Sequence, residues 1–386
     1  MTDAADEAPT PLEVVASAAI GTDVGCVREH NEDAAFGADL GGEPWLTRAT
    51  APLGPRGMVV LVCDGMGGVA GGEVAAAQAV ESTWRELRSA NLAGNPEVAA
   101  RLLRRAVRAA NLDVWTRGRA TPGLRGMGTT ISAAVVVGDA LVIAQVGDSR
   151  IYVHRRGVLT QVTRDQSLVS ALQAAGMLGH GQRPTPQAAG AILQALGVTD
   201  DVEPSLSIVP LRNGDRVLVC SDGLHGLVEP ATLGIVLATR APVDEVTARL
   251  IAAAREAGGH DNITAEVIDI EAGLPPPRDA RDQPEFAEFD PQEEGDGAMS
   301  TTSTVARRLA SRIGLGRDPG RRVPSTGQHA TIPASLPDLS PAPAPASDVA
   351  GPATVQLQGG ARGWQGWLWW GLAAVIVGII AWLVAR

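Results

Sequence analysis

Aspartates recur at the ends of apolar runs, each next to glycine or another small residue. The positions are Asp33, Asp64, Asp148, Asp222 and Asp261, with Glu32 beside the first of them. A single Asp before Gly at the end of a strand is most often a turn residue that bonds its own backbone. The repetition favours another interpretation, because neighbouring carboxylates repel one another and raise each other's pKa unless a cation is bound. The chain contains no Lys to neutralise them, so we expect a divalent-metal centre.

Carboxylate oxygens are the ligands that Mg²⁺ and Mn²⁺ prefer. We expect Asp64, Asp222 and Asp261 to gather, and we expect the Gly65 carbonyl to approach an ion closely because Gly has no side chain. Two ions about 3.5–4 Å apart could share a bridging water and activate it for in-line attack on a phosphate ester. Arg28 lies shortly before Asp33, and its planar guanidinium matches phosphate oxygens. Taken alone, an Arg in this position is more often part of a surface ion pair.

The apolar runs that carry these acids have the length of buried strands. They lie at 58–68, 140–150, 216–226 and 258–271. Helical periodicity is expected at 71–87, 96–115 and 244–259. Short turns between successive runs, as in 131–163, favour antiparallel pairing. The pattern predicts helices packed on two layers of mainly antiparallel sheet.

Composition divides the chain into four regions. Residues 1–12 are acidic and are predicted to be disordered, and 13–272 is predicted to be the folded catalytic domain. Residues 273–363 are rich in Pro and are predicted to be a disordered linker. Residues 364–386 contain an uncharged run, 367–385, that at about 1.5 Å per residue nearly crosses a hydrocarbon layer of roughly 30 Å. They are predicted to be a transmembrane anchor.

Charge and cysteine usage narrow the setting. Arg residues before the predicted anchor place the catalytic region in the cytoplasm, at the cell membrane. The net charge of −11 argues against a nucleic-acid binder. Cys26, Cys63 and Cys220 form no disulfide pattern, and we expect Cys63 and Cys220 to be buried thiols.

The ordered motifs resemble those of the metal-dependent protein phosphatases of type 2C, the PPM family. The matching segments are R-x-x-N-E-D at 28–33, D-G-M-G-G at 64–68, G-T-T at 128–130, G-D-S-R at 147–150, S-D-G at 221–223 and D-N-I-T at 261–264. The resemblance implies an α+β fold, an α-β-β-α sandwich of two antiparallel sheets flanked by helices. It implies hydrolysis of phosphoserine and phosphothreonine in proteins with Mn²⁺ or Mg²⁺, two ions with a third one possible.

The resemblance also implies roles for individual residues. Asp64 would bridge both ions, Gly65 would bind one through its carbonyl, and Asp222 and Asp261 would bind the other. Glu32 and Asp33 would act mainly through water. Asp148 resembles the acid that helps to hold a third metal in bacterial members, and Arg28 would clamp the substrate phosphate. The implied partners are phosphorylated proteins, among them serine/threonine kinases and their substrates, and the catalytic domain is expected to be monomeric.

One residue and one segment depart from the family pattern, and a further stretch is expected to lie near the site. Met66 occupies a position where many eukaryotic members have His, so no side-chain general acid is evident. The segment 176–196 corresponds to the family's mobile flap but has Gln194 where Arg is common. The stretch 40–57 is predicted to be an extended loop near the edge of the site.

Alternative functions stay open at this point. One is a pseudophosphatase that binds phosphorylated partners without cleaving them, but such a protein would be expected to have lost one of Asp64, Asp222 or Asp261. Another is a phosphatase-like regulator that acts on one phosphoserine of a specific partner.

Overall fold

The computed structural model describes residues 14–42, 44–45, 48–52, 56–67, 71–92, 94–176, 178, 190–290 and 330–331. The predicted disordered N-terminus and the predicted anchor at 364–386 lie outside these residues, as does most of the predicted linker. None of the helices among the described residues is both long enough and apolar enough to cross a membrane.

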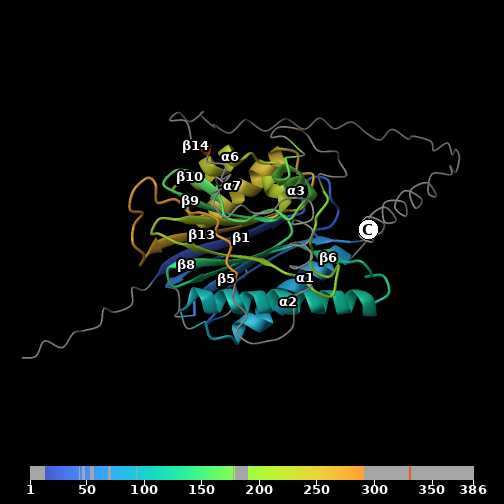
Figure 1. Cartoon of the computed structure of the whole chain (residues 1–386). Helices are drawn as coiled ribbons and strands as arrows, with labels where there is room; N and C mark the ends of the chain where they lie inside the picture. The colour runs from blue at the N-terminus through green and yellow to red at the C-terminus, as the bar shows by residue number, and fades with distance from the viewer. Residues whose placement is uncertain are drawn as a thin grey trace, which may run out of the picture. The chain divides into compact units, whose positions relative to one another are not determined.

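Two antiparallel sheets form the centre of the fold (Figure 1). The first sheet has the strand order β14-β10-β9-β12-β13-β1-β4. Its strands are β1 (Val15–Asp23), β4 (Arg48–Pro52), β9 (Arg150–Arg155), β10 (Val158–Gln161), β12 (Arg216–Cys220), β13 (Ile263–Ala272) and β14 (Ala330–Thr331). The second sheet has the order β11-β8-β7-β5-β2-β3, and β6 pairs with the end of β5. Its strands are β2 (Asp33–Asp39), β3 (Pro44–Trp45), β5 (Met58–Met66), β6 (Gly128–Thr129), β7 (Ile131–Val137), β8 (Ala140–Val146) and β11 (Ser205–Pro210).

Helices cover the outer face of each sheet (Figure 1). The helices on the second sheet are α1 (Gly71–Arg88) and α2 (Pro96–Ala120), and those on the first are α6 (Pro230–Leu237) and α7 (Val243–Glu256). Two short helices, α3 (Leu168–Ala174) and α5 (Asp222–His225), complete the set in the described part of the chain. Helix α2 begins where the Asn95 side chain accepts hydrogen bonds from the amides of Glu97 and Val98, which is a common helix start.

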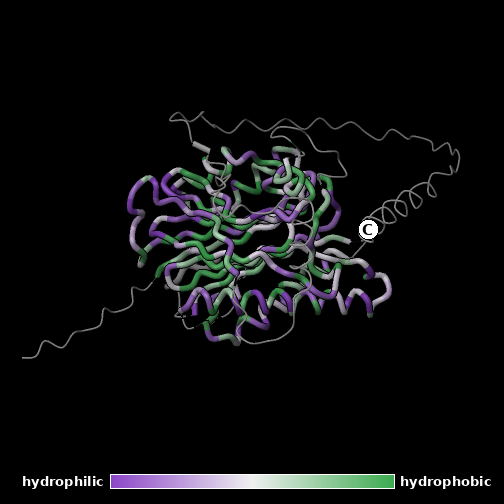
Figure 2. Tube along the Cα trace, viewed as in Figure 1, coloured by the Kyte–Doolittle hydropathy of each residue, from purple (hydrophilic) through white to green (hydrophobic). Residues whose placement is uncertain are grey.

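Three apolar cores separate the four layers. The core between the sheets is aliphatic, and includes Val60, Ile143 and Ile268. A second core joins α1 and α2 to their sheet, and a third joins α6 and α7 to theirs. Figure 2 shows the consequence, with hydrophobic residues along the strands and polar residues on the outer turns. The predicted four-layer sandwich of antiparallel sheets and flanking helices is therefore confirmed.

Two details of the sequence prediction need correction. The stretch 40–57 is not wholly a loop, because Pro44–Trp45 pairs with β2 and Arg48–Pro52 pairs with β1. The packed chain also continues past residue 272. Leu274 is buried, Phe289 packs on the core beneath α2, and the Asp282 carboxylate bonds Arg155 and Arg212. We call residues 273–290 the strap. Its Pro-rich and charged composition does not predict a packed segment, because its contacts are few and join residues far apart in sequence.

Candidate active site

Asp33 and Asp64 face each other across neighbouring strands. Asp33 is the first residue of β2, and its register partner in β5 is Asp64. Such a cross-strand pair places two carboxylates within about 5.5 Å at their Cβ atoms. Like charges in this position are destabilising, so the pair is not explained by folding alone.

Asp222 and Asp261 come from the adjoining ends of the other sheet. Asp222 is the first residue of α5, directly after β12 and Ser221, and Asp261 stands just before β13. The Ser221 hydroxyl donates to Asp33 Oδ2 at 2.8 Å and accepts from the Thr264 amide at 3.0 Å. Ser221 thereby joins the two sheets at the point where the acids meet.

Gly65 permits a close approach of three backbone segments. A Cβ atom built at this position would lie 2.2 Å from the Gly72 carbonyl oxygen and 2.5 Å from that of Glu32. The Gly65 amide also donates to the Glu32 carbonyl at 3.2 Å. Any side chain here would push α1 and the Glu32 segment away from Asp64.

Asn262 fixes the loop that carries Glu32. Its side-chain amide donates to the carbonyl oxygens of Val24 and His30, and its Oδ1 accepts from the Glu32 amide at 2.8 Å. Asn262 therefore holds the Arg-bearing loop against the Asp261 turn.

Arg28 lies at the mouth of the carboxylate cluster. Its guanidinium donates to Asp261 Oδ2 at 2.8 Å, and the two side chains are 49% and 38% exposed. The surface ion pair that is the common arrangement for such an Arg is therefore present. Because Asp261 belongs to the cluster, the same guanidinium would also be within reach of a phosphate bound there. The surface ion pair and the phosphate-binding role are therefore compatible for Arg28.

Asp148 occupies the turn between β8 and β9. Burial, together with the charges of Asp222 and Asp165, raises the pKa of Asp148 to about 7. His225 bonds the Asp148 carbonyl at 3.0 Å. Burial lowers the pKa of His225 to about 3, so His225 is neutral at physiological pH and adds no positive charge to the cluster.

The remaining acids repel one another in a buried setting. Burial raises the pKa of Asp33 to about 7 despite hydrogen bonds from Thr264 and Ser221. Burial and the charges of Asp33 and Asp222 hold the pKa of Asp64 well above its usual range. The pKa of Asp222 is raised by burial.

These groups fit a divalent cation. Asp222 Oδ1 is buried and has no hydrogen-bond partner, which is costly for a carboxylate oxygen. Among the described residues, however, no three His, Cys, Asp or Glu side chains already surround a common point as ligands of one ion would. The reason lies in their present bonds, since Arg28 holds Asp261 and Ser221 holds Asp33. The backbone nevertheless gathers four aspartates at this point, and this placement persists when the side chains rotate.

The structure thus brings together Asp33, Asp64, Asp222 and Asp261, with Asp148 and Arg28 at the edges. Glu32 lies next to this cluster. Its carbonyl oxygen accepts from the Gly65 amide, and its carboxylate lies close to Gly72. Supporting residues were missed by sequence reasoning, although the motifs contained them. The Thr130 hydroxyl accepts from the Asp64 amide at 3.0 Å and bonds Ser149 at 2.8 Å. The G-T-T and G-D-S-R motifs therefore position β5 beneath Asp64.

Comparison with known proteins was consistent with this arrangement. The family profile described as protein phosphatase 2C matches residues 51–266. The serine/threonine phosphatase stp of Listeria monocytogenes is 33% identical over 251 residues, which cover 64% of this chain and 93% of that protein. The serine/threonine protein phosphatase PstP of Mycobacterium tuberculosis is 34% identical over 307 residues, which cover 78% of this chain and 53% of PstP.

Solved structures give the same result for the fold. The serine/threonine phosphatase of S. agalactiae matches with a TM-score of 0.60 and 29% identity, over 66% of this chain and 100% of that one. The catalytic domain of PstP, solved in complex with two manganese ions, matches with a TM-score of 0.55 and 34% identity, over 67% of this chain and 100% of that one.

Proposed function

Because the chain belongs to the protein phosphatase 2C family, we propose that it hydrolyses phosphoserine and phosphothreonine in proteins and requires Mn²⁺ or Mg²⁺. The observation that carries this proposal is the set of four aspartates gathered at one end of the sandwich, three of them with a raised pKa, together with a buried Asp222 oxygen that lacks a hydrogen-bond partner. The intact set disfavours a protein that only binds phosphorylated partners.

The residues of the chain divide the work. Asp64, Asp222, Asp261 and the Gly65 carbonyl would hold the divalent ions, with Asp33 and Glu32 behind them and Asp148 as the ligand of a third. When bound, such ions neutralise charge on the phosphoryl group and favour a water nucleophile at neutral pH. Arg28 would orient the phosphate through its planar guanidinium. Arg28 now bonds Asp261 Oδ2, and this exposed guanidinium would be available to the substrate if Asp261 held an ion.

The test is metal-dependent turnover by the full chain. We expect hydrolysis of p-nitrophenyl phosphate and of phosphothreonine peptides only with Mn²⁺ or Mg²⁺, loss of activity in EDTA, and recovery when Mn²⁺ is returned. The Asp222→Asn variant should stay inactive after Mn²⁺ is returned. Activity that survives both EDTA and Asp222→Asn would remove the metal mechanism.

The proposed setting is the cytoplasmic face of the cell membrane, where the catalytic domain would act as a monomer against serine/threonine kinases and their substrates. The uncharged run at 367–385 and the Arg residues before it support this setting. Removal of residues 364–386 should release the protein from membranes without loss of turnover. A full-length protein that stays in the supernatant after membranes are sedimented would contradict the anchor.

A further inference from the structure

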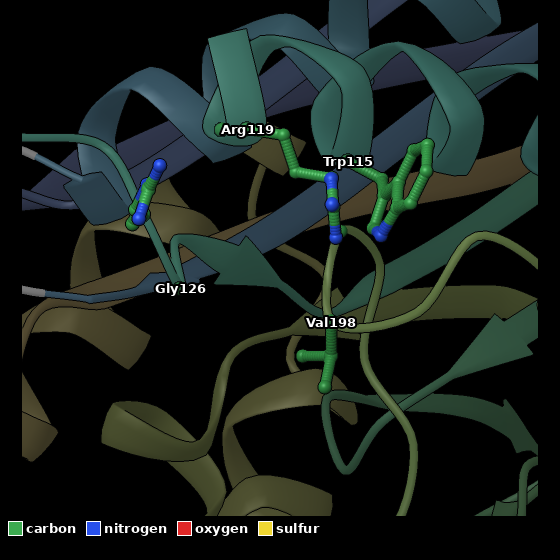
Figure 3. Close-up of a pocket in the computed structure, with 7 residues that line it drawn as sticks. Trp115, Arg119, Gly126 and Val198 are labelled. Carbon is green, nitrogen blue, oxygen red and sulfur yellow. The ribbon is translucent and has the colours of Figure 1, made fainter. Parts of the chain in front are cut away.

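A cavity of about 320 Å³ lies at the C-terminal end of α2, apart from the aspartates. It is lined by Trp115, Gly118, Arg119, Arg125, Gly126, Gly197 and Val198. Figure 3 shows Arg119 and Trp115 projecting from α2 towards Val198 on the opposite wall. The wall opposite α2 is the segment that follows the flap position of the family.

The backbone of the cavity is tightly built. Gly197 has a φ of +82°, and a Cβ atom there would lie 2.4 Å from Val114 and 3.0 Å from the Met127 carbonyl. The Asn111 side chain accepts a hydrogen bond from the Gly197 amide at 2.8 Å. The 197–198 segment is therefore held firmly against α2, and it presents Val198, which is 58% exposed, at the rim.

The described residues that line the cavity include two Arg and no Asp or Glu, so the lining is positively charged. Arg119 lies over the Trp115 ring, with 4.9 Å between its guanidinium carbon and the ring centroid. Neither Arg119 nor Arg125 forms an ion pair with a carboxylate in the described part of the chain. Since guanidinium groups match phosphate oxygens in a planar fork, the cavity is suited to a phosphoryl group.

A second cavity on α2 provides a contrast. Its volume is about 450 Å³, and it contains four Arg residues together with Asp200 and Asp201. There Arg104 bonds Glu203 at 2.7 Å and Arg108 bonds Asp201 at 2.9 Å. Its positive charges are largely met by the protein itself, whereas those at the end of α2 are not.

A short segment of chain connects the first cavity to the carboxylate cluster. Thr130 donates its amide to the Asp64 carbonyl at 2.9 Å, and Gly126, at the cavity edge, precedes Thr130 by four residues. Four extended residues reach at most about 13 Å and neighbouring strands lie about 5 Å apart, so Gly126 lies within about 18 Å of Asp64. Figure 1 shows β6 and the end of α2 at the same end of the molecule.

We infer that this cavity is an accessory subsite for a second phosphoryl group on the substrate protein. The second phosphorylated residue would lie within about five residues of the one being hydrolysed, since five extended residues span about 17 Å. Arg119 and Arg125 would bind the second phosphate, and Val198 and Trp115 would contact the intervening chain. This inference rests on the proposed phosphatase function and specifies its substrates as chains phosphorylated at two nearby positions.

The test compares peptides that carry one phosphothreonine at a fixed position. The residue two to seven positions away is Thr, Glu or a second phosphothreonine. With Mn²⁺, we expect kcat/KM to rise about tenfold for the second phosphothreonine at spacings of up to about five residues and not at longer ones, which corresponds to one good charge-assisted contact. The double variant Arg119→Ala/Arg125→Ala should lose this gain and retain its turnover of the singly phosphorylated peptide.

Arg101→Ala is the matched control, because Arg101 is an exposed Arg on the same helix about 27 Å away along its axis. It should keep the full gain. An equal gain at every spacing, or an equal gain from Glu, would overturn the assignment of a phosphoryl subsite, and so would a gain that survives the double variant.

Calorimetry in EDTA separates this inference from the proposed function. The doubly phosphorylated peptide should bind the unaltered protein about tenfold more tightly than the double variant, even if no peptide is hydrolysed. Equal affinities would overturn the subsite, whereas absence of turnover with Mn²⁺ would overturn only the phosphatase.

Discussion

Two regions of this molecule withdraw aspartates from solvent, and the surroundings of these aspartates differ. On the sandwich flank, Asp215 bonds Arg155 at 2.6 Å, and their side chains are 0% and 2% exposed. At the catalytic end, Asp33, Asp64 and Asp222 lie together, part-buried and with raised pKa values, and Arg28 bonds Asp261 at the surface. Burial is therefore common to both regions, and the presence or absence of a cationic partner distinguishes a structural carboxylate from one that awaits an ion.

The largest expected effect tests the structural pair. Asp215→Asn should lower the free energy of unfolding by about 3–5 kcal/mol, because it removes the carboxylate that bonds the buried Arg155 guanidinium through two nitrogens. Urea denaturation would measure the loss. A change below about 1 kcal/mol would mean that Arg155 finds other partners, such as Asp282 and the Pro210 carbonyl.

An Asp→Asn substitution at the catalytic end should lower activity strongly without lowering the free energy of unfolding. Asp64→Asn should cost about 2.7–4 kcal/mol of transition-state stabilisation, the range for losing one electrostatic stabiliser. Without divalent ions its free energy of unfolding should be unchanged or higher, because a repelling charge has been removed. The measurements are kcat/KM with Mn²⁺ and urea denaturation in EDTA. A variant that is strongly destabilised in EDTA would place Asp64 with the structural acids.

The pH dependence of stability should separate the two regions next. The pKa values of Asp33 and Asp148 are about 7 when folded, against an ordinary 3.8. The folded protein therefore holds protons that the unfolded chain has lost, so stability in EDTA is full below about pH 4 and falls as pH rises towards 7. Each of the two groups contributes at most about 1.4 kcal/mol per pH unit, and we expect a total loss of about 4–5 kcal/mol between pH 5 and 7.

Thermal denaturation at fixed ionic strength would check this slope. With saturating Mn²⁺ the slope should reverse, because ions bind the deprotonated carboxylates. A flat profile in EDTA would indicate that the acids are better solvated than their positions imply.

The smallest effect on stability is expected at Arg28. Arg28→Ala should change the free energy of unfolding by no more than about 1 kcal/mol, as is usual for exposed ion pairs. The variant should nevertheless raise KM for phosphopeptides, because the phosphate loses its planar donor. Arg85→Ala, which breaks another exposed pair with Asp113, is the control and should leave KM unchanged.

Much of the fold and of the site was accessible from the sequence. Apolar runs of strand length gave β5, β8, β12 and β13, and helical periodicity gave α1, α2 and α7 within a few residues. Each aspartate alone could have been a turn residue. The aspartates were assigned to the site because their motifs follow one another in the order found in the family. Ser221, Thr130 and Asn262 were not assigned roles, since hydroxyl and amide side chains are equally at home in turns, and only three-dimensional proximity shows what they bond. The ion pair of Arg28 with Asp261 joins residues far apart in sequence, so spacing could not predict it.

The strap at 273–290 has a consequence beyond the packing of Leu274 and Phe289. Strand β11 is the outermost strand of its sheet, and Phe289 donates its amide to the Leu206 carbonyl while Ser207 bridges to Glu288. Backbone groups that would otherwise offer a template for pairing with a second molecule are thereby occupied within the chain. The strap covers this edge and thereby disfavours self-association. A chain that ends at residue 272 should therefore aggregate more readily than one that ends at residue 290.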